Sequence, residues 1–233
     1  MIDPSLMSAM LSPFWVSVKL ASVTTLCLLL FATPVAYWLA KPSRHHFVAR
    51  FKVLLMGIIA MPLVLPPTVI GFYLLLLFSP SAGMGKWLSE HGISPLIFTF
   101  EGLVIGSIIY SLPFYIQPVY AQFIRIPHSV MDVARLLEPS RFKRFVRVAL
   151  PQARIGIVLG SLIGFAHTIG EFGVVLMIGG SISDETKVIS IAIYEQVEAL
   201  NYEAAHMMSG FLIIIGVFMV VLIASLSRMH QSS

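Results

Sequence analysis

Residues 132–151, DVARLLEPSRFKRFVRVALP, form the one long polar stretch in a chain that is otherwise strongly apolar. The basic residues within it and at its edges are Arg125, Arg135, Arg141, Lys143, Arg144, Arg147 and Arg154. A basic segment of this length between two apolar blocks predicts a large loop on one side of a membrane, presented to a partner. The identity of that partner therefore decides the function of the chain.

The composition around this segment is that of a membrane protein. Of the 233 residues, 58% are hydrophobic and only 11% are charged, whereas soluble domains carry about 25% charged residues. We predict an all-α polytopic membrane protein with one domain over residues 13–227. The lone cysteine, Cys27, excludes a disulfide within the chain.

Five apolar blocks are long enough for membrane helices, which need about 20 residues each. They cover residues 13–40, 53–78, 96–123, 155–178 and 207–226. A sixth apolar run, residues 188–197, is too short to cross a bilayer, and we expect a short interfacial or re-entrant helix there.

The distribution of basic residues predicts the orientation of these helices. The loop after the first block contains Lys41, Arg44, Arg50 and Lys52, and the loop after the third contains residues 132–151. Because cytoplasmic loops are rich in Lys and Arg, both loops should face the cytoplasm. The N-terminus is then outside and the C-terminus inside. The net charge of +4 is therefore explained by topology rather than by nucleic-acid binding, although the basic segment could also be a lipid-headgroup patch.

The residues of an enzyme are missing from the sequence. No phosphate-binding Gly-rich loop with its Lys and Ser/Thr occurs, and the seven histidines are scattered. We expect no catalytic residue, no metal site and no cofactor bound by this chain. If it moves a solute uphill, the energy must come from a partner or an ion gradient.

The polar segment should consist of two short helices. Asp132 lies in the first turn of one, Pro139 interrupts it, and a helical pattern resumes at Arg141 with Phe142, Phe145, Val146 and Ala149 on one side. Two such helices at the membrane surface make a rigid knob that fits a groove on a partner.

This pattern resembles the coupling loop of permease subunits of ABC importers with the type I fold. That loop has a Glu-Ala-Ala triplet, a glycine and a closing Leu-Pro. Here residues 132–134 occupy the triplet. Glu138 stands at the position of the glycine, a residue that would allow a left-handed turn between the two helices. The resemblance implies a coupling loop at 130–151 whose candidate residues are Asp132, Ala134, Arg135, Glu138, Arg141, Leu150 and Pro151.

Two further segments resemble the permease subunits of molybdate importers, whose relatives carry tungstate, sulfate or thiosulfate. They are PLVLPPTVIG at 62–71, whose prolines must break or kink the second helix, and GEFG at 170–173, in the middle of the fourth block. The resemblance covers residues 13–226. It gives these pathway or gate candidates: Pro66, Pro67, His167, Gly170, Glu171, Phe172 and Gly173.

Glu171 has two interpretations. A carboxylate in mid-membrane costs about 3 kcal/mol, so it must face protein or water. His167, one turn earlier, could pair with it. Glu171 then either lies at a gate or ties down backbone left open by Gly170 and Gly173. The same block contains Gly156, Gly160 and Gly164, a spacing that predicts close packing against another helix. A weaker alternative is that this helix approaches a twofold axis.

The resemblance also implies the partners. They are a second copy of this chain, two cytoplasmic ABC ATPase subunits that bind ATP and Mg, and a periplasmic oxyanion-binding protein. The binding protein would dock on outer loops 79–95 and 181–203. The expected location is the inner membrane, and the expected cargo is molybdate, with tungstate or sulfate as alternatives. A different class, an ion-coupled secondary transporter, shares the broken helices and membrane carboxylate.

Overall fold

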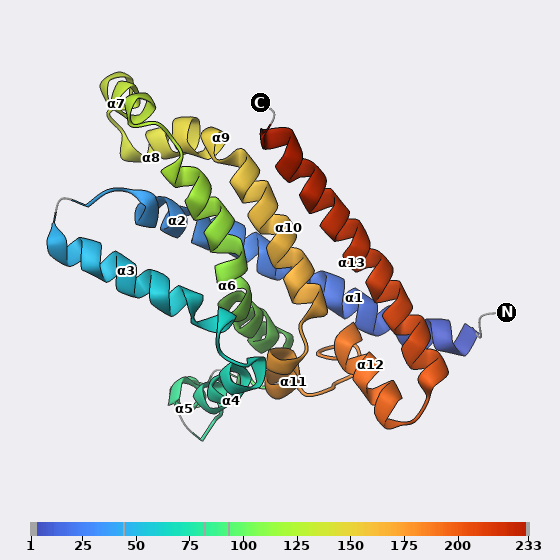
Figure 1. The fold of residues 1–233 in the computed structure, drawn as a ribbon. Coiled ribbons are helices and arrows are strands. Elements are labelled where there is room, and N and C mark those ends of the chain that lie inside the picture. Colours follow the sequence, from blue (N-terminus) through green and yellow to red (C-terminus); the bar gives the residue numbers. More distant parts are fainter. Residues whose placement is uncertain (1–3, 44, 82, 93, 232–233) are drawn as a thin grey trace.

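The first membrane helix is one continuous rod in the computed structural model, which describes residues 4–43, 45–81, 83–92 and 94–231 (Figure 1). Helix α1 (Pro4–Cys27) runs through a π-helical turn, η1 (Leu28–Ala32), into α2 (Thr33–Ala40). Within the described parts of the chain, every regular element is a helix.

The second apolar block is broken by its prolines, as predicted. Helix α3 (His46–Ala60) ends in a short 3₁₀ turn, η2 (Met61–Leu63), and α4 (Pro67–Phe78) begins after Pro66. Helix α5 (Gly83–Glu90) follows. Because α3 starts seven residues before the predicted block, the expectation that Arg50 and Lys52 lie in a loop was wrong: both are on the helix. Arg44 lies outside the described residues.

The remaining elements are two long helices around the polar segment and a helical pair at the C-terminus. Their bounds are α6 (Phe100–Ile124), α7 (His128–Leu137), α8 (Arg141–Arg144), the π-helical η3 (Phe145–Ala149), α9 (Leu150–Gln152), α10 (Arg154–Gly170), α11 (Gly173–Gly179), α12 (Ile189–Glu198) and α13 (Tyr202–Gln231). The expectation that the GEFG motif lies inside the fourth helix was wrong, because α10 ends at Gly170 and Glu171 has extended backbone angles.

Among the described residues, five helical stretches are long and apolar enough to cross a membrane: Met10–Ala40, His46–Leu63, Pro67–Glu90, Phe100–Ile124 and Tyr202–Arg228. A sixth would be the segment Arg141–Gln152 with α10, which meet at a bend of 74°. The expected number, about five, is confirmed. The prolines divide the second predicted block between two of these stretches. Helix α12, with ten residues, is as short as predicted.

Helices α6 and α10 form the centre of the bundle, and they touch through the glycines of α10. A Cβ on Gly156 would lie 2.7 Å from the Pro118 carbonyl oxygen, and one on Gly160 would lie 2.8 Å from that of Tyr115. These glycines therefore serve contact within the chain, which is the first of the two explanations predicted for them.

The two ends of the bundle differ. Helices α7 to α9 lie at the same end as the C-terminus of α13, at the top of Figure 1, and α5, α11 and α12 lie at the opposite end. The outlying helices α3 and α13 are apolar but exposed, since only 6% of the most apolar window of each is buried. Surfaces of this kind suit lipid or a second membrane subunit.

The glycine contact leads to a test of stability. Gly160→Leu should lower the melting temperature of the purified protein, because overpacking a close contact costs about 1–3 kcal/mol. The matched control is Gly216→Leu on α13, where an added Cβ meets nothing within 4 Å. Equal melting temperatures for the two variants would contradict the α6–α10 contact.

Candidate coupling segment and helix-break junction

The polar segment folds as two helical pieces joined by an extended turn. Helix α7 follows Pro127, and the Ser140 hydroxyl caps α8 by accepting a hydrogen bond from the Lys143 amide at 3.4 Å. Pro139 separates the two because it cannot continue a helix. The predicted two-helix knob is therefore confirmed as a shape.

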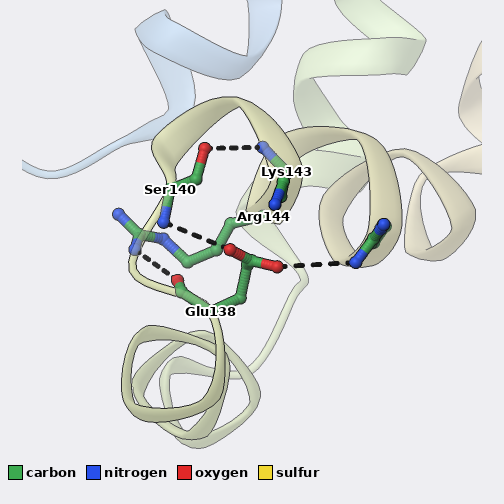
Figure 2. Close-up of polar contacts among 5 residues, drawn as sticks. Glu138, Ser140, Lys143 and Arg144 are labelled. Carbon is green, nitrogen blue, oxygen red and sulfur yellow. Dashed lines mark hydrogen bonds and ion pairs between the residues drawn. The ribbon is translucent and has the colours of Figure 1, made fainter.

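Glu138 holds this turn together (Figure 2). Its backbone is extended, with φ −135° and ψ 99°, so no left-handed residue is needed where the resemblance places glycine. Its carboxylate accepts a hydrogen bond from the Ser140 amide at 3.4 Å and lies 3.5 Å from the Arg147 guanidinium. The Arg144 guanidinium donates to the carbonyl oxygens of Glu138 and Pro139 at 2.7 and 2.8 Å. The glutamate thus connects α7 to α8 and η3.

The outer face of the knob is apolar. Leu136, Leu137 and Phe142 are 86%, 81% and 74% exposed. The expectation that Phe142, Phe145, Val146 and Ala149 share one side was wrong: Phe145 and Ala149 pack in the core, whereas Phe142 and Val146 face outward. The π-helical turn η3 shifts the register of the side chains, which the sequence pattern did not indicate.

The other predicted coupling residues fall into two groups. Asp132 and Arg135 form an exposed ion pair at 2.6 Å, and Arg141 is exposed nearby. Ala134 is buried and anchors α7, while Leu150 and Pro151 lie at the bend before α10. The structure therefore divides the set into an exposed face and an anchor.

The second candidate site lies where the two helix breaks meet. A Cβ on Gly173 would lie 2.7 Å from that of Pro67, so the start of α11 touches the start of α4. A cavity of about 530 Å³ opens there. It is lined by Pro67, Thr68, Tyr110, Ala166, His167, Gly170, Glu171, Phe172 and Gly173.

The cavity contains all the predicted pathway residues except Pro66, which precedes α4. Sequence reasoning missed Thr68, Tyr110 and Ala166. Thr68 directly follows Pro66 and Pro67, and its place beside these candidates could have indicated that it lines the same cavity. Tyr110 and Ala166 carried no signal, because only the packing of α6 and α10 brings them to the cavity.

Glu171 and His167 line one cavity but do not pair. The His167 ring accepts or donates a hydrogen bond with the Ser111 hydroxyl at 3.0 Å and stacks on Phe114 at 3.8 Å. Glu171 is only 5% exposed, and although the Ser107 hydroxyl is nearby, neither carboxylate oxygen has a hydrogen-bond partner of normal geometry among the described residues. Both expectations, pairing with His167 and tying down open backbone, were wrong.

The acidic segment 181–203 is ordered by polar contacts. Glu195 pairs with Lys187 at 2.8 Å and accepts a hydrogen bond from Ser181. Burial raises the pKa of Glu195, but the hydrogen bonds of Lys187 and Ser181 outweigh it and leave that pKa lowered. Asp184 has a positive φ of 64° and accepts a hydrogen bond from Ser12 at 2.5 Å. The loop therefore presents carboxylates at the end of the bundle opposite the coupling segment.

Comparison with known proteins assigns the family. A sequence model described as binding-protein-dependent transport system inner membrane component matches residues 32–232, and the chain belongs to this family. It is a multi-pass membrane permease subunit of an ABC importer. The domain limits 13–227 remain a prediction.

Relatives and a solved structure agree with this class. The chain is 42% identical to the molybdenum transport system permease protein ModB of Azotobacter vinelandii, over 85% of each chain. It is 30% identical to a putative molybdenum permease, YvgM, of Bacillus subtilis, and the match covers 85% of this chain and 86% of that protein. The sulfate permease CysT of Escherichia coli is 29% identical, covering 73% and 61%. A bacterial alginate ABC transporter crystallised with its periplasmic protein matches with TM-score 0.71 at 18% identity, covering 96% and 80%, which confirms the predicted type I fold.

The turn around Glu138 generates a second test. Glu138→Gly should speed amide hydrogen exchange in residues 138–147 by about two- to fivefold, since a solvent-accessible ion pair contributes roughly 0.2–1 kcal/mol. The Arg147 side chain of this pair is 70% exposed and that of Glu138 is 22% exposed. The control is Asp132→Asn, which removes an ion pair confined to α7. Unchanged exchange in Glu138→Gly would show that the carboxylate does not hold the turn.

Proposed function

We propose that the chain is the permease subunit of a molybdate importer, and that two copies line the path while two cytoplasmic ATPase subunits drive it. The observation that carries this proposal is the exposed apolar face of the coupling segment, flanked by Arg141 and Lys143, which have no ion-pair partner among the described residues. The naming of the relatives as molybdenum permeases, at 42% and 30% identity, supports molybdate as the cargo. Tungstate and sulfate are chemically similar alternatives.

The coupling step follows from how the knob is attached. Leu136, Leu137 and Phe142 dock into a groove of the ATPase, which binds ATP and Mg. Docking at exposed apolar side chains is favourable because it removes them from water. Closure of the ATPase pair then pulls on α7 to α9, and the buried Ala134 and Ala149 pass the displacement to the inner ends of α6 and α10.

The path runs beside the helix-break junction. The cavity there contains hydroxyl and imidazole groups from Thr68, Tyr110 and His167, which suit a tetrahedral oxyanion. Glu171 repels a dianion when it is ionised, so we place it at a gate rather than in contact with the cargo. A second copy is needed because one subunit encloses little space for a hydrated anion.

The outside partner and the orientation complete the proposal. The coupling end faces the cytoplasm, which puts the N-terminus outside and the C-terminus, with Arg228, inside. A periplasmic binding protein delivers the anion to segments 79–95 and 181–203, which include helices α5 and α12, and selectivity resides largely in that protein. Asp184 is exposed for this contact, and Glu195, whose carboxylate pairs with Lys187, has a side chain that is 39% exposed.

Reconstitution tests the proposal. Vesicles that contain the chain, its ATPase and its binding protein should take up labelled molybdate only with ATP, and excess tungstate should compete. If excess sulfate inhibited molybdate uptake as strongly as excess tungstate does, the cargo assignment would move to sulfate. Uptake that ignores ATP but follows a pH gradient would instead favour an ion-coupled transporter, for which the unpartnered Glu171 and broken helices are the specific observations.

The gate role of Glu171 has its own test. Glu171→Gln should leave assembly with the ATPase intact, because the side chain keeps its size, and should lower ATP-driven uptake by at least about tenfold, equivalent to roughly 1.4 kcal/mol of barrier. Gln152→Glu, at the surface before α10, is a control for altered charge. A fully assembled Glu171→Gln variant with normal uptake would exclude a charge requirement.

A further inference from the structure

A second, smaller cavity lies at the coupling end, where α2, α6 and α7 meet. Its volume is about 80 Å³, and aromatic and cationic side chains share its wall. The wall includes Tyr37, Lys41, Phe123, His128 and Arg135. This cavity is separate from the helix-break junction, with which it shares no lining residue.

The charges around this cavity are not balanced. Burial lowers the pKa of the Lys41 ammonium, and Arg141, Arg144, Lys52 and Arg135 lower it further by repulsion. Among the described residues, no carboxylate lies within ion-pair distance of Lys41, Arg141 or Arg144. Arg135 has only the exposed Asp132 of its own helix. A group of cations held together without anions is a site that an anion would stabilise.

The surroundings indicate that this anion carries apolar chains. Lys41 lies 3.8 Å from the Tyr37 ring, and Lys52 lies 4.8 Å from the Trp38 ring and donates to the Trp38 and Lys41 carbonyls at 2.5 and 2.6 Å. Tryptophan with lysine at a helix end is typical of the headgroup level of a bilayer. Ile124, also on the cavity wall, is 53% exposed. Phe51, whose ring centroid lies 6.3 Å from that of Trp38, is 48% exposed. The site thus combines cations with uncovered apolar side chains.

We propose that this cavity binds the phosphate headgroup of an anionic phospholipid of the inner leaflet, with acyl chains lying over Ile124 and Phe51. Basic pockets between membrane helices on the cytoplasmic side take such headgroups. The inference rests on the proposed orientation. Free inorganic phosphate would satisfy the cations but leave the apolar side chains uncovered. The apolar docking face lies on α7 and α8, whereas most of the cavity wall belongs to the ends of α2 and α6 and to the residues that follow them.

The site adjoins the coupling segment through α7. Arg135 and His128 belong to α7, and Tyr37 packs on Phe145 of η3 with ring centroids 4.9 Å apart. A bound headgroup would therefore hold the base of the knob against the membrane surface. This gives the basic segment a role in lipid recognition besides docking to the ATPase.

Lipid binding to the purified importer, permease with ATPase, tests the proposal by native mass spectrometry. Phosphatidylglycerol should bind, and phosphatidylcholine should bind at least tenfold more weakly. Lys41→Gln should weaken phosphatidylglycerol at least fivefold. The control Lys143→Gln removes the same charge from the coupling segment, at a position outside the cavity wall, and it should change binding less than twofold.

A photoactivatable phosphatidylglycerol used on the wild-type importer gives a readout that needs no variant. Its crosslinks should fall within residues 37–52 and 123–135. Crosslinks elsewhere, equal losses in Lys41→Gln and Lys143→Gln, or inorganic phosphate displacing the lipid would overturn the proposal. If the Lys41→Gln permease no longer copurified with the ATPase subunit but still bound lipid normally, the cations would form part of the ATPase interface and not a lipid site. Because lipid binding is read without uptake, a failure of the transport proposal is seen separately in the vesicle assay.

Discussion

The close contact between α6 and α10 is the constraint on which the rest of the structure depends. Gly156 and Gly160 let α10 approach the α6 carbonyl oxygens so nearly that no Cβ fits between them. These two helices are also the ones that the coupling segment joins. A displacement of the knob at one end must therefore be carried by the pair together, since packed helices transmit strain rather than absorb it.

Two of the apolar blocks lose regular helix part-way along their length, and they do so at the same place. Prolines interrupt the second block, and Glu171 interrupts the fourth, and the two interruptions meet at Pro67 and Gly173. Broken helices at membrane depth are tolerated where they line protein or a water-filled cavity. The cavity at this junction fits that rule. The knob and the junction are thus opposite ends of one mechanical unit built on α6 and α10.

The sequence was sufficient for the class, the helix count and the two-helix knob, because composition, prolines and basic residues act locally. It was not sufficient for the partners of particular side chains. The neighbours of His167 are Ser111 and Phe114, more than fifty positions away on α6, and no spacing rule reaches that far. The outward position of Phe142, on α8 just before the π-helical turn, is equally invisible to a 3.6-residue pattern. Glu138 was noticed as unusual, but its contacts with Arg144 and Arg147 required the fold.

Site-specific crosslinking tests the central claim, that the knob is driven by an ATPase, most directly. Two single-cysteine variants, Leu136→Cys and Phe142→Cys, would each be made in a Cys27→Ala background. Intact membranes that contain the whole importer would then be treated with a reagent that links a thiol to an amine. The account predicts an adduct with the ATPase from both positions and none from Lys86→Cys at the opposite end of the bundle. An adduct from Lys86→Cys alone, or knob cysteines labelled by an impermeant reagent from outside the cell, would contradict it.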